Sequence, residues 1–120
     1  IEKIELKEAI GLPIELVSIN LKTDLKISSP KKLEDIYKKL KTEGYKLVAP
    51  EIAIYSCLYL KKQKPGSWLR FAVPLNSMVD DDGIPHLPKM GYALNKRFIE
   101  TYWSYKDAIF HPHNNFIVMK

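Results

Sequence analysis

The stretch at residues 52–75, IAIYSCLYLKKQKPGSWLRFAVPL, constrains the fold of this chain more than any other. Two runs rich in β-branched and aromatic residues flank a lysine-rich joint that ends in Pro65 and Gly66. This pattern is typical of a β-hairpin. Both faces of the first arm are apolar, which places that strand in the middle of a sheet whose two faces are covered. A helix is the alternative for this arm, because periodicity alone does not decide apolar runs of this length.

The clearest helix signal covers residues 30–43. Ser29 can cap the first turn, Pro30 suits the first helical position, and Gly44 suits the left-handed residue that follows the last turn. Between them, four apolar residues recur at helical spacing and share one face: Leu33, Ile36, Tyr37 and Leu40. The pattern predicts a helix that packs on the sheet through this face and shows its lysines to water.

The segments before this helix carry mixed signals. Residues 1–10 fit an edge strand or a short helix that ends before Gly11 and Pro13. Residues 14–21 alternate partly between apolar and polar side chains, and residues 22–24 supply turn chemistry before the chain resumes at Leu25. We therefore expect a first hairpin there.

The carboxyl-terminal third predicts a long loop, a helix and a final strand. Residues 76–90 contain adjacent aspartates, a glycine and two prolines, and are interpreted as a loop. Residues 91–94 predict a short strand, after which Asn95 can cap a helix at residues 96–109. The apolar stripe of that helix is Phe98, Tyr102, Tyr105 and Ile109. The same residues are good strand formers, so a strand is the alternative. Residues 116–119 predict the terminal strand.

These segments together predict one α+β domain over residues 1–120. Its antiparallel sheet has four to six strands built around the hairpin at residues 52–75, with the helix at 30–43 packed on it and a second helix near 96–109. A length of 120 residues suits a single domain. The hydrophobic share of 46% and the charged share of 28% are those of a folded globular protein.

Composition also bears on location and partners. No apolar run approaches the roughly 18 residues that span a bilayer, and the first residues carry acids where a signal peptide would be apolar. We therefore expect a soluble, cytoplasmic protein without a membrane partner. The net charge is +5, but of 19 basic residues only Arg70 and Arg97 are arginine. This bias favours a solvated surface or diffuse attraction to an acidic partner over specific phosphate contacts. The single cysteine, Cys57, excludes an intramolecular disulfide and is expected to be buried and inert.

Acidic residues and histidines form the first candidate site. Carboxylates and imidazoles are ligands of divalent metals, and a His-x-His pair can reach one ion. The candidates are Asp80, Asp82, His86, His111 and His113. Adjacent aspartates beside a glycine are more often a solvated turn, and we predict neither a metal nor a cofactor. The metal interpretation depends on whether the two loops meet in space.

The second candidate is a metal-free nuclease site. A histidine there would act as the base while an arginine stabilises charge on a phosphate. His111, His113, Arg70 and Arg97 have the required chemistry. Any basic protein with three histidines contains residues of this kind. The presence of these residues therefore makes a nuclease only an alternative hypothesis.

Aromatic residues interleaved with basic ones form the third candidate. Such a mixture can stack nucleobases or anchor a protein interface. The binding residues predicted on this basis are Trp68, Arg70, Arg97, Tyr102, Trp103 and Tyr105. Three aromatics within residues 102–105 are more than one helix face can bury, so at least one of them is expected to be exposed.

The sequence lacks the motifs of common nucleotide-dependent and hydrolytic enzymes. It contains no G-x-x-x-x-G-K-[ST], G-x-G-x-x-G, H-E-x-x-H or G-x-S-x-G pattern. The leading hypothesis is therefore a small non-enzymatic binding or regulatory module that contacts a protein partner or a second copy of itself. A nuclease or other phosphodiester-binding enzyme is the first alternative, and non-catalytic nucleic-acid binding is the second.

Overall fold

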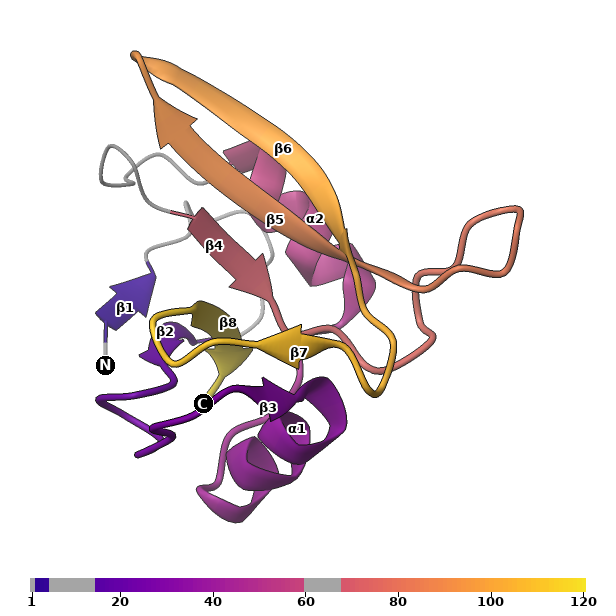
Figure 1. The fold of residues 1–120 in the computed structure, drawn as a ribbon. Helices are drawn as coiled ribbons and strands as arrows, with labels where there is room; N and C mark the ends of the chain where they lie inside the picture. Colours follow the sequence, from indigo (N-terminus) through magenta and orange to yellow (C-terminus); the bar gives the residue numbers. More distant parts are fainter. Residues whose placement is uncertain (1, 5–14, 60–67) are drawn as a thin grey trace.

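A computed structural model of the chain describes residues 2–4, 15–59 and 68–120. Within these residues the fold is α+β, as predicted (Figure 1). The main sheet has six described strands in the order β1-β2-β8-β4-β5-β6, and a separate two-stranded ribbon pairs β3 with β7. The sheet strands are β1 (Glu2–Ile4), β2 (Leu16–Asn20), β8 (Asn115–Met119), β4 (Trp68–Phe71), β5 (His86–Ala93) and β6 (Lys96–Trp103). The ribbon strands are β3 (Lys31–Lys32) and β7 (Ile109–Phe110).

The main sheet is mixed, whereas the sequence predicts an antiparallel one. Strands β4 and β8 run parallel, with Arg70 opposite Phe116 and Phe71 opposite Ile117. The other described pairs in this sheet are antiparallel. The terminal strand, predicted at residues 116–119, is confirmed as β8. It lies between β2 and β4, so it joins the amino-terminal part of the chain to the β4-β5-β6 part.

Helix α1 (Leu33–Thr42) confirms the predicted amphipathic helix and buries all four residues of its apolar stripe. It begins three residues later than residue 30, because Lys31–Lys32 pair with β7 as a strand. Ser29 therefore does not cap it. The amides of Leu33 and Glu34 instead donate to the carbonyls of Ala108 and Lys106, at 2.8 Å each. Gly44, with φ of +89°, ends the helix as predicted.

The central hairpin predicted at residues 52–75 is wrong. Its first arm belongs to helix α2 (Pro50–Tyr59), and its second arm contains strand β4. The predicted lysine-rich joint lies outside the described residues. Proline is well accommodated in the first turn of a helix. Ala53 and Cys57 are buried while Ile54 and Leu58 are exposed. Apolar residues thus occur all round α2, which removes the helical period from the sequence.

The helix predicted near residues 96–109 is also wrong, and the strand alternative holds for residues 96–103. Strand β6 pairs with β5 along its whole length, from His86 opposite Trp103 to Ala93 opposite Lys96. Leu94 and Asn95 form the two-residue turn with φ of 52° and 60°. Two positive φ angles match the twist of a hairpin, so Asn95 turns the chain instead of capping a helix.

The predicted loop at residues 76–90 is too long, because β5 already begins at His86. Pro88 occupies a position in β5 at which a backbone amide would face the β4 side of the sheet. The last β4–β5 pair is Arg70 with Lys89, so the missing N–H of Pro88 falls just beyond that ladder. The proline is therefore compatible with a strand that the sequence pattern conceals.

The first predicted hairpin is correct only in its first strand, β2. Strand β2 pairs with β1 and β8, and the residues after Leu25 form no strand with it. The Asn20 side chain holds this connection as a turn, because its Oδ1 accepts hydrogen bonds from the amides of Lys22 and Thr23. Residues 2–4 form a strand, one of the two alternatives for residues 1–10; residues 5–14, including Gly11 and Pro13, lie outside the described residues.

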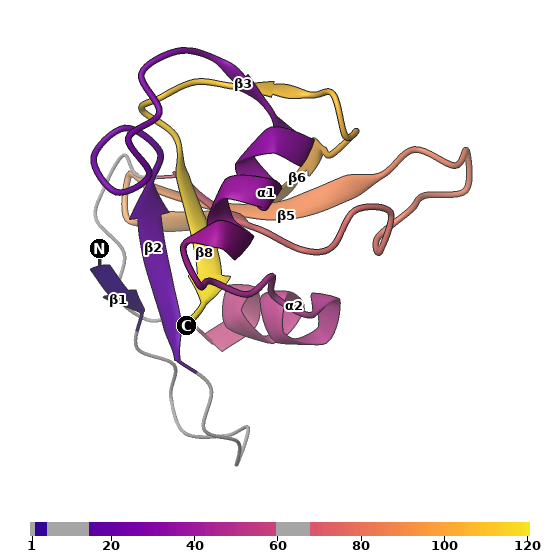
Figure 2. The same ribbon diagram turned by 90° about the horizontal axis from the view of Figure 1, so that it is seen from below.

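The two faces of the sheet are covered differently. Helix α2 lies on one side of β5, and the β3–β7 ribbon lies on the other side of the sheet (Figure 2). The buried core includes Phe71, Phe110 and Phe116, and Cys57 is buried as predicted. In the described parts of the chain, no helix is both long and apolar enough to cross a membrane.

Candidate functional site

Six side chains of β4, β5 and β6 share one face of the sheet. Residues directly opposite each other in neighbouring strands point to the same side, and alternate residues point to opposite sides. Trp68 lies opposite Gly91, which lies opposite Phe98, and Arg70 lies opposite Lys89, which lies opposite Glu100. This register gathers Trp68, Arg70, Lys89, Phe98, Glu100 and Tyr102, and we call them the aromatic–basic face.

Lys89 lies at the centre of the aromatic–basic face. Its Nζ is 4.6 Å from the ring centroid of Trp68, 5.3 Å from that of Tyr102 and 3.5 Å from Glu100 Oε2. An ammonium within about 6 Å of an aromatic centroid is attracted by the negative face of the ring. These contacts hold Trp68 and Tyr102 on either side of one cation.

Arg70 extends this arrangement toward the core. Its Cζ lies 5.7 Å from the Tyr102 ring centroid, and its Nε is buried without a hydrogen-bond partner among the described residues. Burial lowers the pKa of the Arg70 guanidinium, while its electrostatic interaction with Tyr102 acts in the opposite direction. The ordinary arginine pKa is so high that the group stays charged. The Arg70 guanidinium is therefore a half-buried cation beside the Tyr102 ring.

The β3–β7 ribbon covers one end of the aromatic–basic face. Phe110 of β7 packs against Tyr102 at 5.3 Å and against Phe116 at 5.0 Å between ring centroids. Tyr102 therefore links the hydrophobic core to the surface. Trp68 and Phe98 are both exposed. The part of the aromatic–basic face that the ribbon leaves uncovered lies nearer the turn between β5 and β6.

Among the described strands, β6 lies at the edge of the main sheet, and all its residues except Arg97 are exposed. The amide of Ser104 donates to the carbonyl of Pro85 at 3.0 Å, which continues the β5–β6 register. Antiparallel ladders alternate between bonded and non-bonded pairs. Even-numbered residues of β6 therefore bond to β5. The odd-numbered ones, Arg97, Ile99, Thr101 and Trp103, direct their backbone groups outward.

The predicted binding residues are divided by this arrangement. Trp68, Arg70 and Tyr102 come together on the aromatic–basic face. Trp103 and Ile99 project from the opposite face of β6 and are 65% and 52% exposed. Tyr105 lies beyond β6 in a turn that is closed by a hydrogen bond from the Ala108 amide to its carbonyl. Arg97 lies opposite Tyr92 near the hairpin turn. Strand β6 therefore exposes aromatic and aliphatic side chains on both of its faces.

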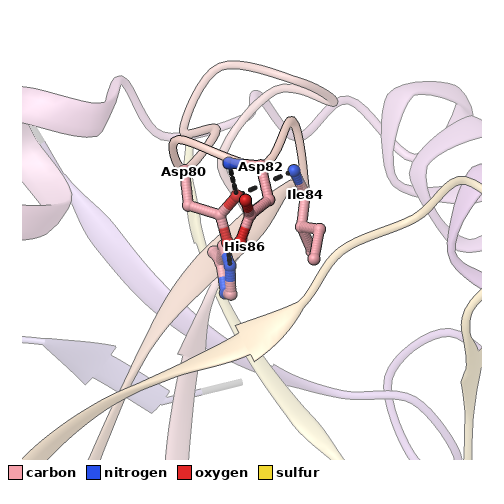
Figure 3. A network of polar contacts seen from close by, with 4 residues as sticks. All are labelled: Asp80, Asp82, Ile84 and His86. Carbon is pink, nitrogen blue, oxygen red and sulfur yellow. Dashed lines mark hydrogen bonds and ion pairs between the residues drawn. The ribbon is translucent and has the colours of Figure 1, made fainter.

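Asp80 and His86 form a second polar cluster (Figure 3). Asp80 Oδ2 lies 2.8 Å from His86 Nε2, and Asp80 Oδ1 accepts hydrogen bonds from the amides of Asp82 and Ile84. The hydrogen bond from His86, together with those from the Ile84 and Asp82 amides, lowers the pKa of the Asp80 carboxyl group. His86 Nδ1 is buried and has no partner among the described residues. The cluster closes the turn before β5, with His86 Nε2 bonded to Asp80 and His86 Nδ1 buried.

The other metal candidates lie elsewhere. His111 and His113 stack on each other with ring centroids 5.9 Å apart, in the turn between β7 and β8. Within residues 15–59 and 68–120, no three His, Cys, Asp or Glu side chains are grouped so that they could hold a metal ion. The metal candidates thus lie in two separate pairs, Asp80 with His86 and His111 with His113.

The nuclease candidates are likewise not assembled. Figure 1 shows the β5–β6 hairpin turn, next to Arg97, well apart from the turn between β7 and β8 that carries His111 and His113. The Arg70 guanidinium lies over Tyr102. Among the described residues, no arginine contacts His111 or His113.

The predicted binding residues did not include Lys89, Phe98 and Glu100 of the aromatic–basic face, nor Gly91, on which Trp68 packs. Lys89 and Gly91 lie within β5, in a segment interpreted as loop and short strand. Residues 86–93, HLPKMGYA, show no regular alternation of apolar and polar side chains and contain a proline, so the local pattern does not mark them as a strand. Comparisons with protein-family models, with curated proteins and with solved structures gave no match to this chain.

Proposed function

We propose that this chain is a non-enzymatic protein-binding module that accepts an extended segment of a partner at the edge of β6. One observation carries the proposal: an edge strand of eight residues exposes apolar side chains on both faces beside its outward backbone groups. An unpaired strand edge is a template for another strand, and an added strand gains affinity from main-chain hydrogen bonds.

The edge of β6 has few of the features that prevent strand addition. Natural edge strands are commonly short, interrupted by proline or bulged. Strand β6 contains no proline, and its register with β5 is continuous from residue 96 to residue 103. Lys96 and Arg97 are its positive charges, and both lie next to the hairpin turn. Residues 98–103 are therefore the more accessible part of the edge.

Side chains on both faces supply selectivity. An added strand points alternate side chains to opposite faces of the sheet. On one face they would meet Phe98 and Tyr102, and on the other Ile99 and Trp103, all of which are exposed. Lys96, Arg97 and the net charge of +5 favour an acidic partner segment. A second copy of the chain is the alternative occupant.

Ile99 provides a direct test, because its backbone amide points outward while its neighbours hold β6 to β5. Ile99→Pro removes that donor, whereas Ile99→Ala removes the side chain and keeps the donor. A library of ten-residue peptides selected on the wild-type chain should yield extended sequences that also bind Ile99→Ala but not Ile99→Pro. Equal binding to both variants, or no enriched peptide, would contradict the proposal. Analytical ultracentrifugation of the chain without peptide shows whether a second copy occupies the edge, because self-pairing would give a dimer.

Binding of single-stranded nucleic acid is a second candidate, favoured by the aromatic–basic face. Bases can stack on exposed aromatic rings while cations contact the phosphates. Trp68, Phe98 and Lys89 have that combination on one sheet face. Affinity for a mixed-sequence oligonucleotide should then fall steeply with salt, and Trp68→Ala should weaken it more than Trp103→Ala. A flat salt response would contradict phosphate contacts.

A further inference from the structure

A cavity beside α1 lies apart from β6. It has a volume of about 490 Å³, within the range that encloses small-molecule ligands. Its apolar wall consists of Tyr37 from α1, Tyr45 and Leu47 from the segment after α1, and Leu75 from the loop after β4. Figure 1 shows α1 at the opposite end of the molecule from the β5–β6 hairpin.

The wall of this cavity is held in place by hydrogen bonds. The Tyr37 hydroxyl donates to the carbonyl of Val73 at 2.6 Å, which ties α1 to the loop that carries Leu75. Lys46 and Met119 exchange two backbone hydrogen bonds of 2.8 Å. The amide of Tyr45 donates to Leu40 at 3.0 Å. A wall fixed from three directions needs little ordering when a ligand enters, which lowers the free-energy cost of binding.

The rim of the cavity is positive. Lys38, Lys41 and Lys46 line it and are exposed, and Glu34 is the acid among the lining residues. Three cations against one carboxylate leave an excess of two positive charges at the mouth. An apolar interior below a cationic rim is complementary to a molecule with an apolar body and one anionic end.

We propose that this cavity binds a small amphipathic carboxylate of the medium-chain fatty-acid type. The chain of the ligand occupies the space between Tyr45, Leu47 and Leu75, and its carboxylate lies among Lys38, Lys41 and Lys46. This site is independent of the edge of β6, so a negative result at either site leaves the other unaffected.

Decanoate and decanamide are suitable probes, because they share the apolar chain and differ in charge. In a titration followed by amide NMR shifts, decanoate should shift the signals of Tyr45, Leu47 and Leu75 and bind more tightly than decanamide. Absence of shifts at these residues up to about 5 mM decanoate would overturn the proposal. Equal affinities for the two probes would overturn it as well.

Two double variants separate the role of the rim from that of net charge. Lys38→Gln with Lys41→Gln should weaken decanoate binding about tenfold and leave decanamide unchanged. Lys32→Gln with Lys39→Gln removes the same charge from residues that do not line the cavity and should have little effect. Similar losses in both double variants would contradict a specific rim. Leu75→Trp should fill the cavity and abolish the shifts; the surface variants decide the question if it fails to fold.

Discussion

The indole ring of Trp68 lies directly over Gly91, its cross-strand neighbour. A β-carbon at position 91 would come within 2.7 Å of the ring atoms Cη2 and Cζ3. Glycine thus leaves the space in which Trp68 packs on the sheet with Lys89 Nζ 4.6 Å from its ring centroid. The shape of the aromatic–basic face therefore depends on a residue with no side chain.

Gly91→Ala should displace the Trp68 ring at a cost of at most about 1 kcal/mol, because the contacted atoms are the outer ring atoms of an exposed side chain. In a Trp103→Phe background Trp68 is the remaining tryptophan, so its fluorescence reports its displacement. Gly83→Ala is the control: position 83 has open space but φ of +79°, so its cost is backbone strain. The control should lose stability without a fluorescence change, and an unchanged spectrum in Gly91→Ala would contradict the packing.

Tyr37→Phe should cost about 1–2 kcal/mol of unfolding free energy, because it leaves the Val73 carbonyl without the Tyr37 donor in a buried site. Burial also raises the pKa of the Tyr37 hydroxyl, so the group remains a neutral donor throughout the ordinary pH range. Tyr105→Phe, at an exposed residue, should change stability by less than about 0.5 kcal/mol. Urea unfolding measures both, and equal effects would argue against the role of the buried hydroxyl.

Asp80 should give the fold a pH-dependent contribution. Its folded-state pKa is lowered from 3.8, first by the hydrogen bond with His86, so the contribution is fully present above the ordinary value. It is lost as the pH falls through the lower, folded-state value. The stability difference between the wild type and Asp80→Ala should thus be constant above about pH 5 and shrink below about pH 4.

Asp80→Asn is the control for that experiment. The amide oxygen can still accept hydrogen bonds from the Asp82 and Ile84 amides, but it carries no charge. This variant should lose less stability than Asp80→Ala at neutral pH. A wild-type advantage over Asp80→Ala that persists undiminished at about pH 2.5 would show that the carboxylate charge contributes nothing.

The sequence predicts those elements whose local pattern agrees with their tertiary environment. Helix α1 is recognisable because its apolar residues share one buried face. Helix α2 is not, because Ile54 and Leu58 on its exposed side are as apolar as its buried side. In β6 the apolar residues lie on both exposed faces, so their spacing fits a helix as well as a strand. Pairing with β5 decides that residues 96–103 form a strand. The sequence of β5 contains a proline, so it does not predict this partner strand.

The candidate site follows the same rule. The presence of exposed aromatics beside basic residues can be predicted from composition, and Trp68, Arg70 and Tyr102 do lie together. Lys89 and Gly91 acquire their roles only through cross-strand register, which sets Trp68 opposite Gly91 and Arg70 opposite Lys89. Register depends on contacts between segments far apart in the chain, and a local sequence pattern does not encode it.

Hydrogen exchange at individual amides of β6 tests the central claim most directly. Exchange is measured by NMR for the chain alone and for the chain with a peptide selected on it. Strand addition predicts that the outward amides of Arg97, Ile99, Thr101 and Trp103 gain protection of at least about tenfold, while the amides already bonded to β5 change little. Protection without this alternation, or protection confined to another part of the molecule, would contradict binding at the β6 edge.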